Sequence, residues 1–434
     1  MFTKQTIRDI DLHSKTVLLR ADFNVPIKDG KIEDDYRITQ AMPTINYLLE
    51  QNTRLIIMSH LGRPKSPDDA DCSLWPVAKR LGEILGKDRV SFAKDCIGPE
   101  AERAAEQLEH GKVLLLENVR YHAEEEKNSA EFAKQLASLA ELFVEDGFGV
   151  VHRAHASTEG VAHYLPSVAG FLLEKEVDTI TNVMQNPKRP LVAVIGGAKI
   201  SDKIDILNKF IDLADVVAVG GAMANTFLYA QGIEVGDSLI EKQDVQVAKD
   251  IIEKAKAKSQ QQDFVFYLPQ DGVVAHKVDK TAPTRIVDWS AHVIADIENY
   301  PKRPPIGDTR IKEHEMILDI GPFSASFIAG SLQLAQTVVW NGSMGVAETP
   351  AVHGPVGPTA HGTELVIEAI IGQYGHKPFS VVGGGDTVSY IENRKMTELF
   401  NHVSTGGGAS LELMAGKKLP GVEALLDKKS EVVQ

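Results

Sequence analysis

The chain has 434 residues, a formal net charge of −14 and a hydrophobic content of 43%. This length exceeds what one hydrophobic core usually supports, so we expect two domains. The negative charge opposes a general surface for nucleic acid or for anionic membranes, because such partners need a broad basic footprint. The only cysteines, Cys72 and Cys96, show no spacing typical of a disulfide framework or a zinc site, and we expect two ordinary thiols.

The N-terminus contains no apolar signal segment. No run approaches the about 18 consecutive apolar residues that a membrane-spanning helix needs. We therefore expect a cytoplasmic protein that binds neither membranes nor nucleic acid.

Short β-branched runs alternate with longer segments of helical period, which is typical of α/β units around mostly parallel sheets. In the first half, strands are predicted at residues 16–22, 53–59, 112–118 and 141–146. Between the first two, Ile38, Met42, Ile45 and Leu49 recur at helical spacing and predict a crossover helix.

The segment 171–185 also carries apolar residues at helical spacing. We interpret it as an interdomain helix, and the alternative is an ordinary surface helix of the first domain. In the second half, strands are predicted at residues 189–197, 214–221, 263–269, 315–321, 337–342, 377–384 and 402–407. Each half is expected to form its own sheet.

Polar and glycine-rich motifs follow these predicted strands throughout the chain. In the first half these residues are Asp22, Asn24, His60, Arg63, Arg120 and Arg153. In the second half they are four glycine-rich turns, which contain Gly196 and Gly197, Gly220 and Gly221, Gly383 to Gly385, and Gly406 to Gly408. Ligands of open α/β sheets lie at the carboxyl ends of the strands. Both domains are therefore expected to present a ligand-binding face.

We expect all four glycine-rich turns in one domain. Together they indicate a nucleotide site, because glycine lets backbone amides approach a phosphate closely. Lys199 and Lys203 are four residues apart, and we expect both on one face of a helix that begins there. Neither a Walker A loop nor a GxGxxG fingerprint is present. Asp386 is a hard oxygen ligand suited to Mg²⁺, and the alternative is that Asp386 and Thr387 cap a helix.

The arginines of the first half have forked guanidinium groups that match carboxylate and phosphate oxygens. Arg37 follows two acids at the start of a predicted helix, where a cation opposes the helix dipole, and this local conflict indicates a functional role. His152 and His155 are interpreted as structural histidines, with a metal pair as the alternative. No Ser/His/Asp or Cys/His pattern is readable, so covalent catalysis has little support. A direct phosphoryl transfer needs no such nucleophile and depends on alignment and charge neutralisation.

Over essentially its whole length the chain resembles the phosphoglycerate kinases. The motifs that carry the resemblance are ADFNVP, DDYRI, SHLGRP, ENVR, HRAHAS, GGAKISDK, GGAMANTF, DIGP, WNGSMGV, GGGDT and HVSTGGGASLE. The resemblance implies two Rossmann-like three-layer α/β domains joined by a hinge helix. It also implies a monomeric glycolytic enzyme that moves a phosphoryl group reversibly from 1,3-bisphosphoglycerate to ADP. The products are 3-phosphoglycerate and ATP, the cofactor is Mg²⁺, and the transfer is in line after hinge closure.

The resemblance also assigns domains and residue roles. The implied domains are 1–170 for 3-phosphoglycerate, 171–188 for the hinge helix, 189–405 for the nucleotide, and 406–434 for a segment that returns to the first domain. The implied substrate-binding residues are Asp22, Phe23, Asn24, Arg37, His60, Leu61, Gly62, Arg63, Arg120 and Arg153. The implied catalytic residues are Arg37, Lys199, Lys203, Gly407 and Gly408. The implied nucleotide-binding residues are Lys203, Gly220, Gly221, Asn341, Glu348, Gly384, Gly385, Asp386 and Thr387, with Asp386 as the metal ligand.

The chain departs from the family pattern near Glu348. Ser343 stands where Pro is usual, Ala347 where Phe is usual, and the segment 349–362 is longer than usual and expected to be an exposed loop. These departures affect the nucleotide pocket and leave the transfer residues intact. Two alternatives remain open: a catalytically silent nucleotide-binding or scaffold protein, and a dinucleotide dehydrogenase, which the missing GxGxxG fingerprint opposes.

Overall fold

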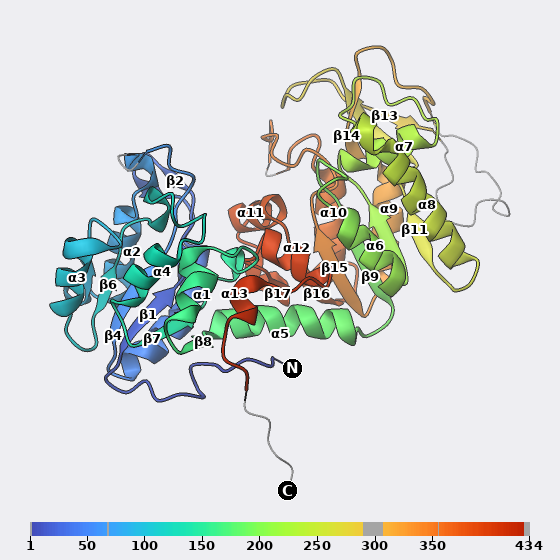
Figure 1. Ribbon diagram of the computed structural model, residues 1–434. Coiled ribbons are helices and arrows are strands. Elements are labelled where there is room, and N and C mark those ends of the chain that lie inside the picture. Colours follow the sequence, from blue (N-terminus) through green and yellow to red (C-terminus); the bar gives the residue numbers. More distant parts are fainter. Residues whose placement is uncertain (1, 67–68, 290–306, 355, 429–434) are drawn as a thin grey trace, which may run out of the picture. The chain divides into compact units, whose positions relative to one another are not determined.

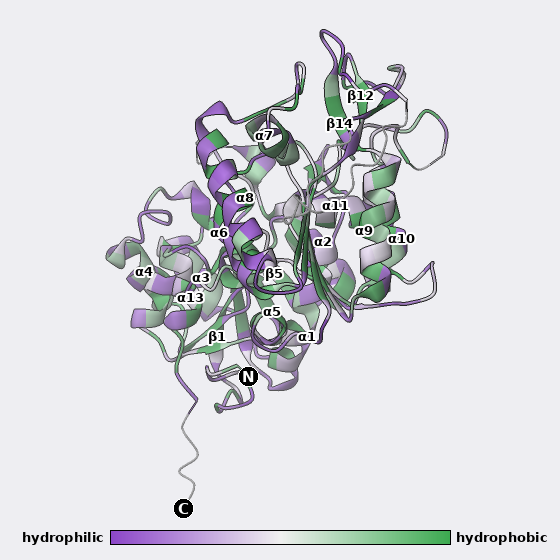
Figure 2. Cartoon of the chain, turned by 90° about the vertical axis from the view of Figure 1, so that its right-hand side faces the viewer, coloured by the Kyte–Doolittle hydropathy of each residue, from purple (hydrophilic) through white to green (hydrophobic). Residues whose placement is uncertain are grey.

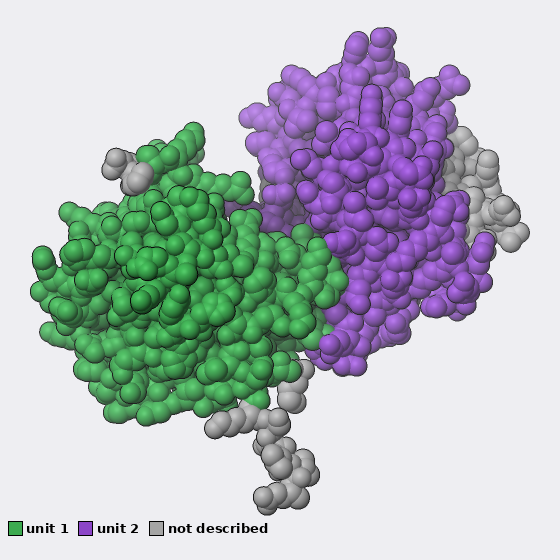
Figure 3. Space-filling model, viewed as in Figure 1, with its two compact units in different colours: residues 1–181, 405–434 green, residues 182–404 purple. Residues whose placement is uncertain are grey.

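A computed structural model describes residues 2–66, 69–289, 307–354 and 356–428. The chain forms two compact units, coloured separately in Figure 3. Unit 1 comprises residues 1–181 and 405–434, and unit 2 comprises residues 182–404. The boundary falls inside helix α5 (Phe171–Gln185), so a continuous helix carries the chain from the first unit into the second.

Unit 1 is built on a parallel six-stranded sheet, in the order β5-β6-β4-β1-β7-β8 (Figure 1). Its strands are β1 (Thr16–Arg20), β4 (Arg54–Met58), β5 (Val90–Phe92), β6 (Val113–Leu115), β7 (Leu142–Glu145) and β8 (Ser167–Ala169). β1 and β6 are buried along their whole length, as expected of parallel strands that helices cover on both faces. A two-stranded hairpin, β2 (Ile27–Lys28) and β3 (Lys31–Ile32), follows β1.

The helices of unit 1 connect these strands and cover the sheet. The α-helices are α1 (Tyr36–Glu50), α2 (Trp75–Leu85), α3 (Gly98–Glu106), α4 (Ala130–Ala137), α12 (Gly408–Met414) and α13 (Pro420–Glu423), besides the first part of α5. Single turns occur at η1 (Ala70–Cys72), η2 (Lys87–Arg89), η3 (Val119–Tyr121), η4 (Phe148–Val150), η5 (Ala156–Gly160) and η6 (Val161–His163). The last two helices belong to the segment after Ser404, which returns to unit 1.

Unit 2 contains a second parallel six-stranded sheet, in the order β11-β10-β9-β15-β16-β17. Its strands are β9 (Leu191–Ile195), β10 (Val216–Val219), β11 (Val265–Tyr267), β15 (Thr337–Asn341), β16 (Phe379–Gly383) and β17 (His402–Val403). Numbered along the chain within this sheet, the order is 3-2-1-4-5-6, which is the order of the dinucleotide-binding fold. From β9 the next strands are added on one side, and from β15 they are added on the other, although all strands remain parallel. Figure 2 shows the strands in green, in agreement with the complete burial of β9 and β15.

The helices of unit 2 lie against this sheet, and α9 packs on α10. They are α6 (Ile204–Leu213), α7 (Met223–Ala230), α8 (Val245–Ser259), α9 (Pro322–Leu334), α10 (His361–Ile370) and α11 (Gly385–Asn393), with short turns η7 (Lys242–Asp244) and η8 (Thr397–Leu399). A separate antiparallel sheet consists of β12 (Asp271–Ala275) between β13 (Arg285–Asp288) and β14 (Met316–Ile320).

The prediction of two α/β domains with parallel sheets is confirmed, and the helix expected at 171–185 is present. The strand expected at 315–321 also forms, but it pairs antiparallel in the small sheet, so the expectation of one sheet per half is wrong for the second half. Among the described residues, no helix is both long and apolar enough to cross a bilayer.

Candidate active site

Two loops of unit 1 carry substrate-binding residues predicted from the sequence. Asp22 and Asn24 follow β1, and His60 and Arg63 follow β4. β1 and β4 are neighbours in parallel register, so their carboxyl ends meet at one edge of the sheet. The structure therefore brings these two motifs together.

Asp22 lies at the centre of this cluster and is buried. Arg37 Nη1 donates to Asp22 Oδ2, and His60 Nδ1 lies 4.0 Å from Asp22 Oδ1. Burial alone would raise the pKa of Asp22, but the charge of Arg37 and the hydrogen bond from the Asn24 amide lower it to about 2. The ionised carboxylate thus holds Arg37, and it compensates a cation in the first turn of α1 that the helix dipole disfavours.

His60 is held by a buried arginine that the sequence analysis did not single out. Arg20, the last residue of β1, is 1% exposed, and its Nη2 lies 3.3 Å from His60 Nδ1. A guanidinium can only donate, so Nδ1 accepts and the ring proton sits on Nε2. Burial lowers the pKa of His60 well below its usual value, which keeps the ring neutral. The free Nε2–H is a donor suited to a substrate oxygen.

Hydrogen bonds tie the remaining loops of this site together. Asn24 Oδ1 accepts from the Gly62 amide at 2.8 Å, and the Gly62 carbonyl accepts from Arg120 Nη1 at 2.9 Å. The Leu61 carbonyl accepts from Asn118 Nδ2 at 2.7 Å. The loops after β1, β4 and β6 are thereby fixed to one another, and Arg120 is oriented by backbone.

The cluster has an excess of positive charge. The pKa of Arg120 is lowered by burial and by the charges of Arg20 and Arg153, against the attraction of Glu126. Cations that depress one another's pKa bind an anion favourably, because a bound anion relieves their repulsion. This electrostatic pattern supports an anionic ligand in unit 1.

Three other predicted residues differ in their exposure. Phe23 is fully buried, so only its backbone, whose amide donates to Ser59 Oγ, is available near the site. Arg63 and Arg153 are exposed. Arg153 Nε donates to the neighbouring His152 Nε2 at 3.2 Å. The structure therefore separates an ordered, half-buried centre from two arginines that face solvent.

The fourth glycine-rich turn, Gly406 to Gly408, belongs to unit 1, so the expectation of four such turns in one domain is wrong. After β17 the Thr405 amide and hydroxyl both donate to Glu176 Oε1 of α5. A Cβ on Gly406 would lie 2.2 Å from the Phe148 ring. The chain therefore leaves unit 2 just before this turn, which packs on the segment after β7.

Gly149 places this turn beside the Asp22 cluster. A Cβ at Gly149 would lie 2.2 Å from Asp22 Oδ2 and 3.3 Å from the Thr405 carbonyl oxygen. Gly407 adopts φ +49° and precedes the first residue of α12, Gly408. The amides predicted to act in catalysis thus lie on the same unit as Arg37.

Unit 2 contains a pocket beside the turns that follow β9, β10 and β15. Its lining residues are Gly197, Ala198, Gly221, Ala222, Ala224, Asn225, Leu228, Pro269, Trp289, Ile317, Leu318, Asp319, Ile320, Ser343, Met344, Gly345, Val346, Glu348 and Asp386. Three of these, Gly221, Glu348 and Asp386, were predicted to bind nucleotide. The pocket lies where the strand order reverses, which is the ligand position of this fold.

Lys203 is buried at the N-terminus of α6, and it donates to Asn341 Oδ1 at the end of β15. Burial lowers the pKa of Lys203 to about 8, although Asp202 and Asp386 act in the opposite direction. The Asn341 Nδ2 group is buried and has no hydrogen-bond partner among the residues that the structure describes. A buried ammonium and an unsatisfied amide at one place form a donor pair suited to a phosphate oxygen.

The expectation that Lys199 and Lys203 share one face of a helix is wrong. Helix α6 begins at Ile204, and Lys203 is its N-cap residue. Gly197 adopts φ +124°, and the following residues form an irregular turn instead of a helix. Lys199 is consequently exposed on the turn, whereas Lys203 points inward.

Gly220 and Gly221 form a backbone contact that excludes side chains. A Cβ on Gly221, whose φ is +67°, would lie 2.6 Å from both the nitrogen and the oxygen of Gly197. A Cβ on Gly220 would lie 2.5 Å from Met344 Sδ. The two glycines therefore allow the turns after β9 and β10 to approach each other, and Gly221 also lines the pocket.

The turn after β16 rules out one of the two interpretations of Asp386. The N-cap of α11 is Gly384, at φ +95° and without a side-chain cap, and Asp386 lies within the first turn. The capping interpretation of Asp386 and Thr387 is therefore wrong, because Thr387 Oγ1 accepts from the Gly342 amide at 2.9 Å instead. The exposed Asp386 carboxylate lines the pocket, which fits a hard ligand for a magnesium–phosphate complex.

The segment that departs from the family pattern borders the pocket. Ser343 lines it, Ala347 is buried, and Glu348 is exposed at its rim. The expectation of an exposed loop over 349–362 holds only in part. Helix α10 already begins at His361, and Thr359 is buried with its hydroxyl donating to the Val346 carbonyl.

Trp289 and Asp319 line the pocket but were not identified as site residues. The Trp289 indole donates to the Pro269 carbonyl at 2.8 Å, and its ring fills the place where a side chain on Gly272 would lie. Burial raises the pKa of Asp319 to about 8, and this carboxyl accepts from the Gly362 amide. Asp319 lies in β14 of the antiparallel sheet and Trp289 directly follows β13, and no local sequence signal relates that sheet to the glycine turns.

His152 and His155 do not form a metal centre with a third ligand among the described residues. Burial and the charge of Arg120 lower the pKa of His155 to about 4. Its Nδ1 lies 3.7 Å from Glu125 Oε1. The Nδ1 atom of each histidine is buried and has no hydrogen-bond partner among the described residues.

Comparison with known proteins decides the family. The model of the family described as phosphoglycerate kinase matches residues 7–417. The chain belongs to the phosphoglycerate kinase family. The curated phosphoglycerate kinase of Moorella thermoacetica is 47% identical over 98% of this chain and 100% of its own length, and that of Pelotomaculum thermopropionicum is 46% identical over the same shares.

Solved structures of phosphoglycerate kinases agree with the fold. That from Coxiella burnetii has a TM-score of 0.78 at 36% identity and covers 97% of this chain and 98% of its own. That from Pyrococcus horikoshii has a TM-score of 0.80 at 30% identity, with 98% of each chain covered. The predictions of a phosphoglycerate kinase and of its two-sheet α/β architecture are confirmed, and the dehydrogenase alternative is wrong.

Proposed function

We propose that unit 1 binds 3-phosphoglycerate or 1,3-bisphosphoglycerate, that unit 2 binds ADP or ATP with Mg²⁺, and that the chain acts as a monomer. The observation that carries this assignment is the contrast in donors. Unit 1 presents clustered cations around His60, and unit 2 presents Lys203 and the unpartnered Asn341 amide where the strand order reverses. The assigned reaction is the reversible phosphoryl transfer of the phosphoglycerate kinase family.

In unit 1, the glycerate ligand contacts the groups that the loops already orient. The Nε2–H of His60 and the guanidinium of Arg120 bind its oxygens, and the solvent-facing Arg63 and Arg153 bind its phosphate. Arg37 differs in role, because it acts on the phosphoryl group in transfer. Its partner Asp22 keeps it in position without removing its charge.

In unit 2, the glycine turns leave room for the nucleotide, and Lys203 binds its phosphates. Glu348 at the pocket rim accepts hydrogen bonds from the ribose hydroxyls. Asp386 would hold Mg²⁺, which shields the negative charge of the phosphates when it is bound. Lys199, exposed on the turn after β9, binds the transferring group, together with the amides of Gly407 and Gly408 on unit 1.

The transfer breaks the bond between phosphorus and the carboxyl oxygen of 1,3-bisphosphoglycerate. A terminal oxygen of ADP forms the new bond to phosphorus, and the carboxylate of 3-phosphoglycerate leaves. Neither the attacking oxygen nor the leaving carboxylate requires a protein base, so positioning and charge neutralisation account for catalysis. The ligands of the two units must come together for each turnover, which is the closure that the family resemblance implies.

A coupled assay of ATP formation from 1,3-bisphosphoglycerate and ADP tests this function. We expect turnover that requires both substrates and Mg²⁺. Nucleotide binding to the purified chain, without turnover at saturating concentrations of both substrates, would instead support the catalytically silent alternative. Sedimentation of the purified chain checks the monomer, and a dimer over the assay's concentration range would contradict it.

A further inference from the structure

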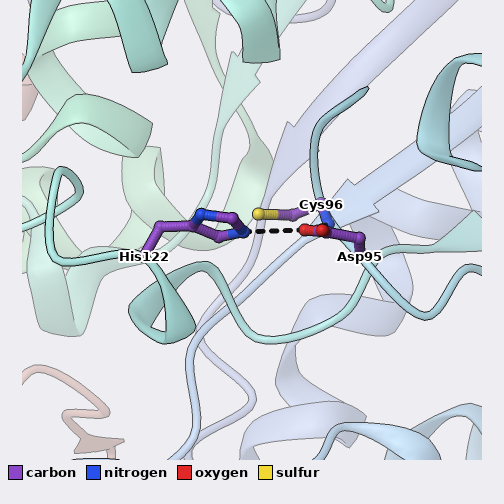
Figure 4. A group of neighbouring side chains, drawn as sticks. All are labelled: Asp95, Cys96 and His122. Carbon is purple, nitrogen blue, oxygen red and sulfur yellow. Dashed lines mark hydrogen bonds and ion pairs between the residues drawn. The ribbon is translucent and has the colours of Figure 1, made fainter. Parts of the chain in front are cut away.

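Asp95, Cys96 and His122 of unit 1 gather their side chains at one point, although the sequence showed no zinc spacing (Figure 4). We propose that they bind one divalent transition-metal ion of the zinc type as a structural site. None of the three was assigned to the glycerate or the nucleotide site. The ion would complete its coordination with one water molecule.

The geometry of the cluster supports a metal ion. One ligand atom from each residue lies within 4.8 Å of the other two. His122 Nε2 is 2.7 Å from Asp95 Oδ1. Neighbouring ligand atoms around a tetrahedral zinc ion are separated by roughly 3.3–3.6 Å, as follows from its bond lengths. The His122–Asp95 contact must therefore open by roughly 0.7 Å when the ion binds.

The exposure of the three side chains permits this change. Cys96 is fully buried and fixed in the core, whereas the side chains of Asp95 and His122 are 44% and 27% exposed. The His122 ring also packs on Phe132, with centroids 5.2 Å apart, which restrains its plane. Two partly exposed ligands thus lie beside one buried sulfur, and their exposure leaves the fourth position open to water.

The fold explains why these residues meet. Asp95 and Cys96 lie in the loop after β5, and His122 follows η3 after β6. β5 and β6 are parallel neighbours at the edge of the sheet, so the chain leaves both strands on the same side. An ion held here would fasten the loop after β5 to the loop that carries Arg120.

The donor set selects the type of ion. Thiolate and imidazole favour Zn²⁺ and similar ions such as Co²⁺, whereas Mg²⁺ prefers oxygen ligands and retains its water. The thiol must lose its proton to solvent when the metal–sulfur bond forms. The thiolate and imidazole ligands therefore distinguish this site from the Mg²⁺ site proposed at Asp386, whose ligand is a carboxylate.

Titration of the chelator-treated full-length chain with Zn²⁺ alone and with Co²⁺ alone tests the proposal. We expect one ion per chain, a rise in the thermal unfolding temperature, and the near-ultraviolet charge-transfer absorption of a cobalt–thiolate bond. His122→Ala and Asp95→Asn each weaken binding about tenfold or more, since even loss of an outer-shell partner costs that much. Excess Mg²⁺ does not displace the ion.

Cys72→Ser is the matched control, because Cys72 is the other free thiol of the chain. It should retain the cobalt–thiolate absorption, and Cys96→Ser should lose it. Because Cys96 is buried, its replacement can unfold the chain, but the variants at His122 and Asp95 test the site without that risk. Absence of saturable binding, equal affinity in His122→Ala, Asp95→Asn and wild type, or loss of the absorption in Cys72→Ser would overturn the proposal.

Discussion

The ligand-binding regions of the two units use different chemistry at the same place in the fold. In unit 1, polar and charged side chains from β1, α1 and the loops after β1 and β4 pair with one another. Asp22 holds Arg37, and Arg20 holds His60. In unit 2, backbone turns form the pocket, and the buried Lys203 donates to a neutral amide. The first region thus depends on side-chain identity, and the second depends on backbone space and on the protonation of one lysine.

Replacement of Arg37 by alanine should have the largest effect. If Arg37 stabilises the transferring phosphoryl group, turnover falls by about 10³ to 10⁵, by analogy with arginine fingers. Arg80→Ala is a matched control, since Arg80 pairs with Asp35 at the start of the same helix but is not in the site. Steady-state turnover at saturating substrates, with unfolding temperature as a check, measures the effect. A loss below tenfold in Arg37→Ala would remove this role.

Lys203→Met should reduce the kcat/KM for ADP by about 100- to 1000-fold, the cost of losing one strong donor to a charged group in a closed site. The pH dependence is more diagnostic. Because the pKa of Lys203 is about 8 and the protonated form binds phosphate, kcat/KM should be constant below that pH and fall above it.

The pH profile of kcat/KM for ADP measures this fall. Lys209→Met, at an exposed position on α6, should retain the wild-type profile. The same profile with the same midpoint in Lys203→Met would show that another group titrates.

Gly221→Ala tests whether backbone space shapes unit 2. The new Cβ would meet the Gly197 backbone at 2.6 Å, and the residue would keep a positive φ, so we expect a loss of stability of about 1–3 kcal/mol. Gly385→Ala is the control, because its Cβ would meet no atom within 4 Å. Its unfolding free energy should stay within about 0.5 kcal/mol of wild type. Equal denaturation midpoints for Gly221→Ala and Gly385→Ala would contradict the argument.

Trp289 provides the smallest effect and the most local readout. ADP binding should change the fluorescence of Trp289, and Trp289→Phe should abolish that change while raising the KM for ADP about fivefold, equivalent to about 1 kcal/mol. Trp75→Phe, in unit 1, should keep the response. A full response in Trp289→Phe would place the nucleotide elsewhere.

The sequence predicts the strands of the large sheets well where they are long and β-branched, as at residues 191–195 and 337–341. It predicts the polar residues at their ends for the same reason, since parallel strands put these residues on one edge. The strands β5 and β8 were not predicted, because each is a three-residue run that includes a serine, whereas the equally short β6 and β11 are wholly apolar or aromatic.

Contacts between side chains that are far apart in the sequence could not be predicted from the strand pattern. The residue that orients His60, Arg20, is four positions before Asn24 but belongs to a buried strand, where an arginine gives no sign of its partner. The indole of Trp289 reaches the pocket only because β13 pairs with β12. The helix expected to begin at Lys199 begins later in the structure, because the turn that starts at Gly197, with its positive φ, includes Lys199. The spacing of the two lysines does not reveal the length of this turn.

The return of the last residues to unit 1 has a consequence for synthesis. The Leu426 amide donates to the Ser167 carbonyl, and the Leu426 carbonyl accepts from the Gln5 amide. The ribosome makes Gln5 before any residue of unit 2 and Leu426 after the last one. Unit 2 is one continuous stretch, so its whole sequence is available before that of unit 1. Although domains generally fold from the N-terminus during synthesis, the unit that begins first here is completed last.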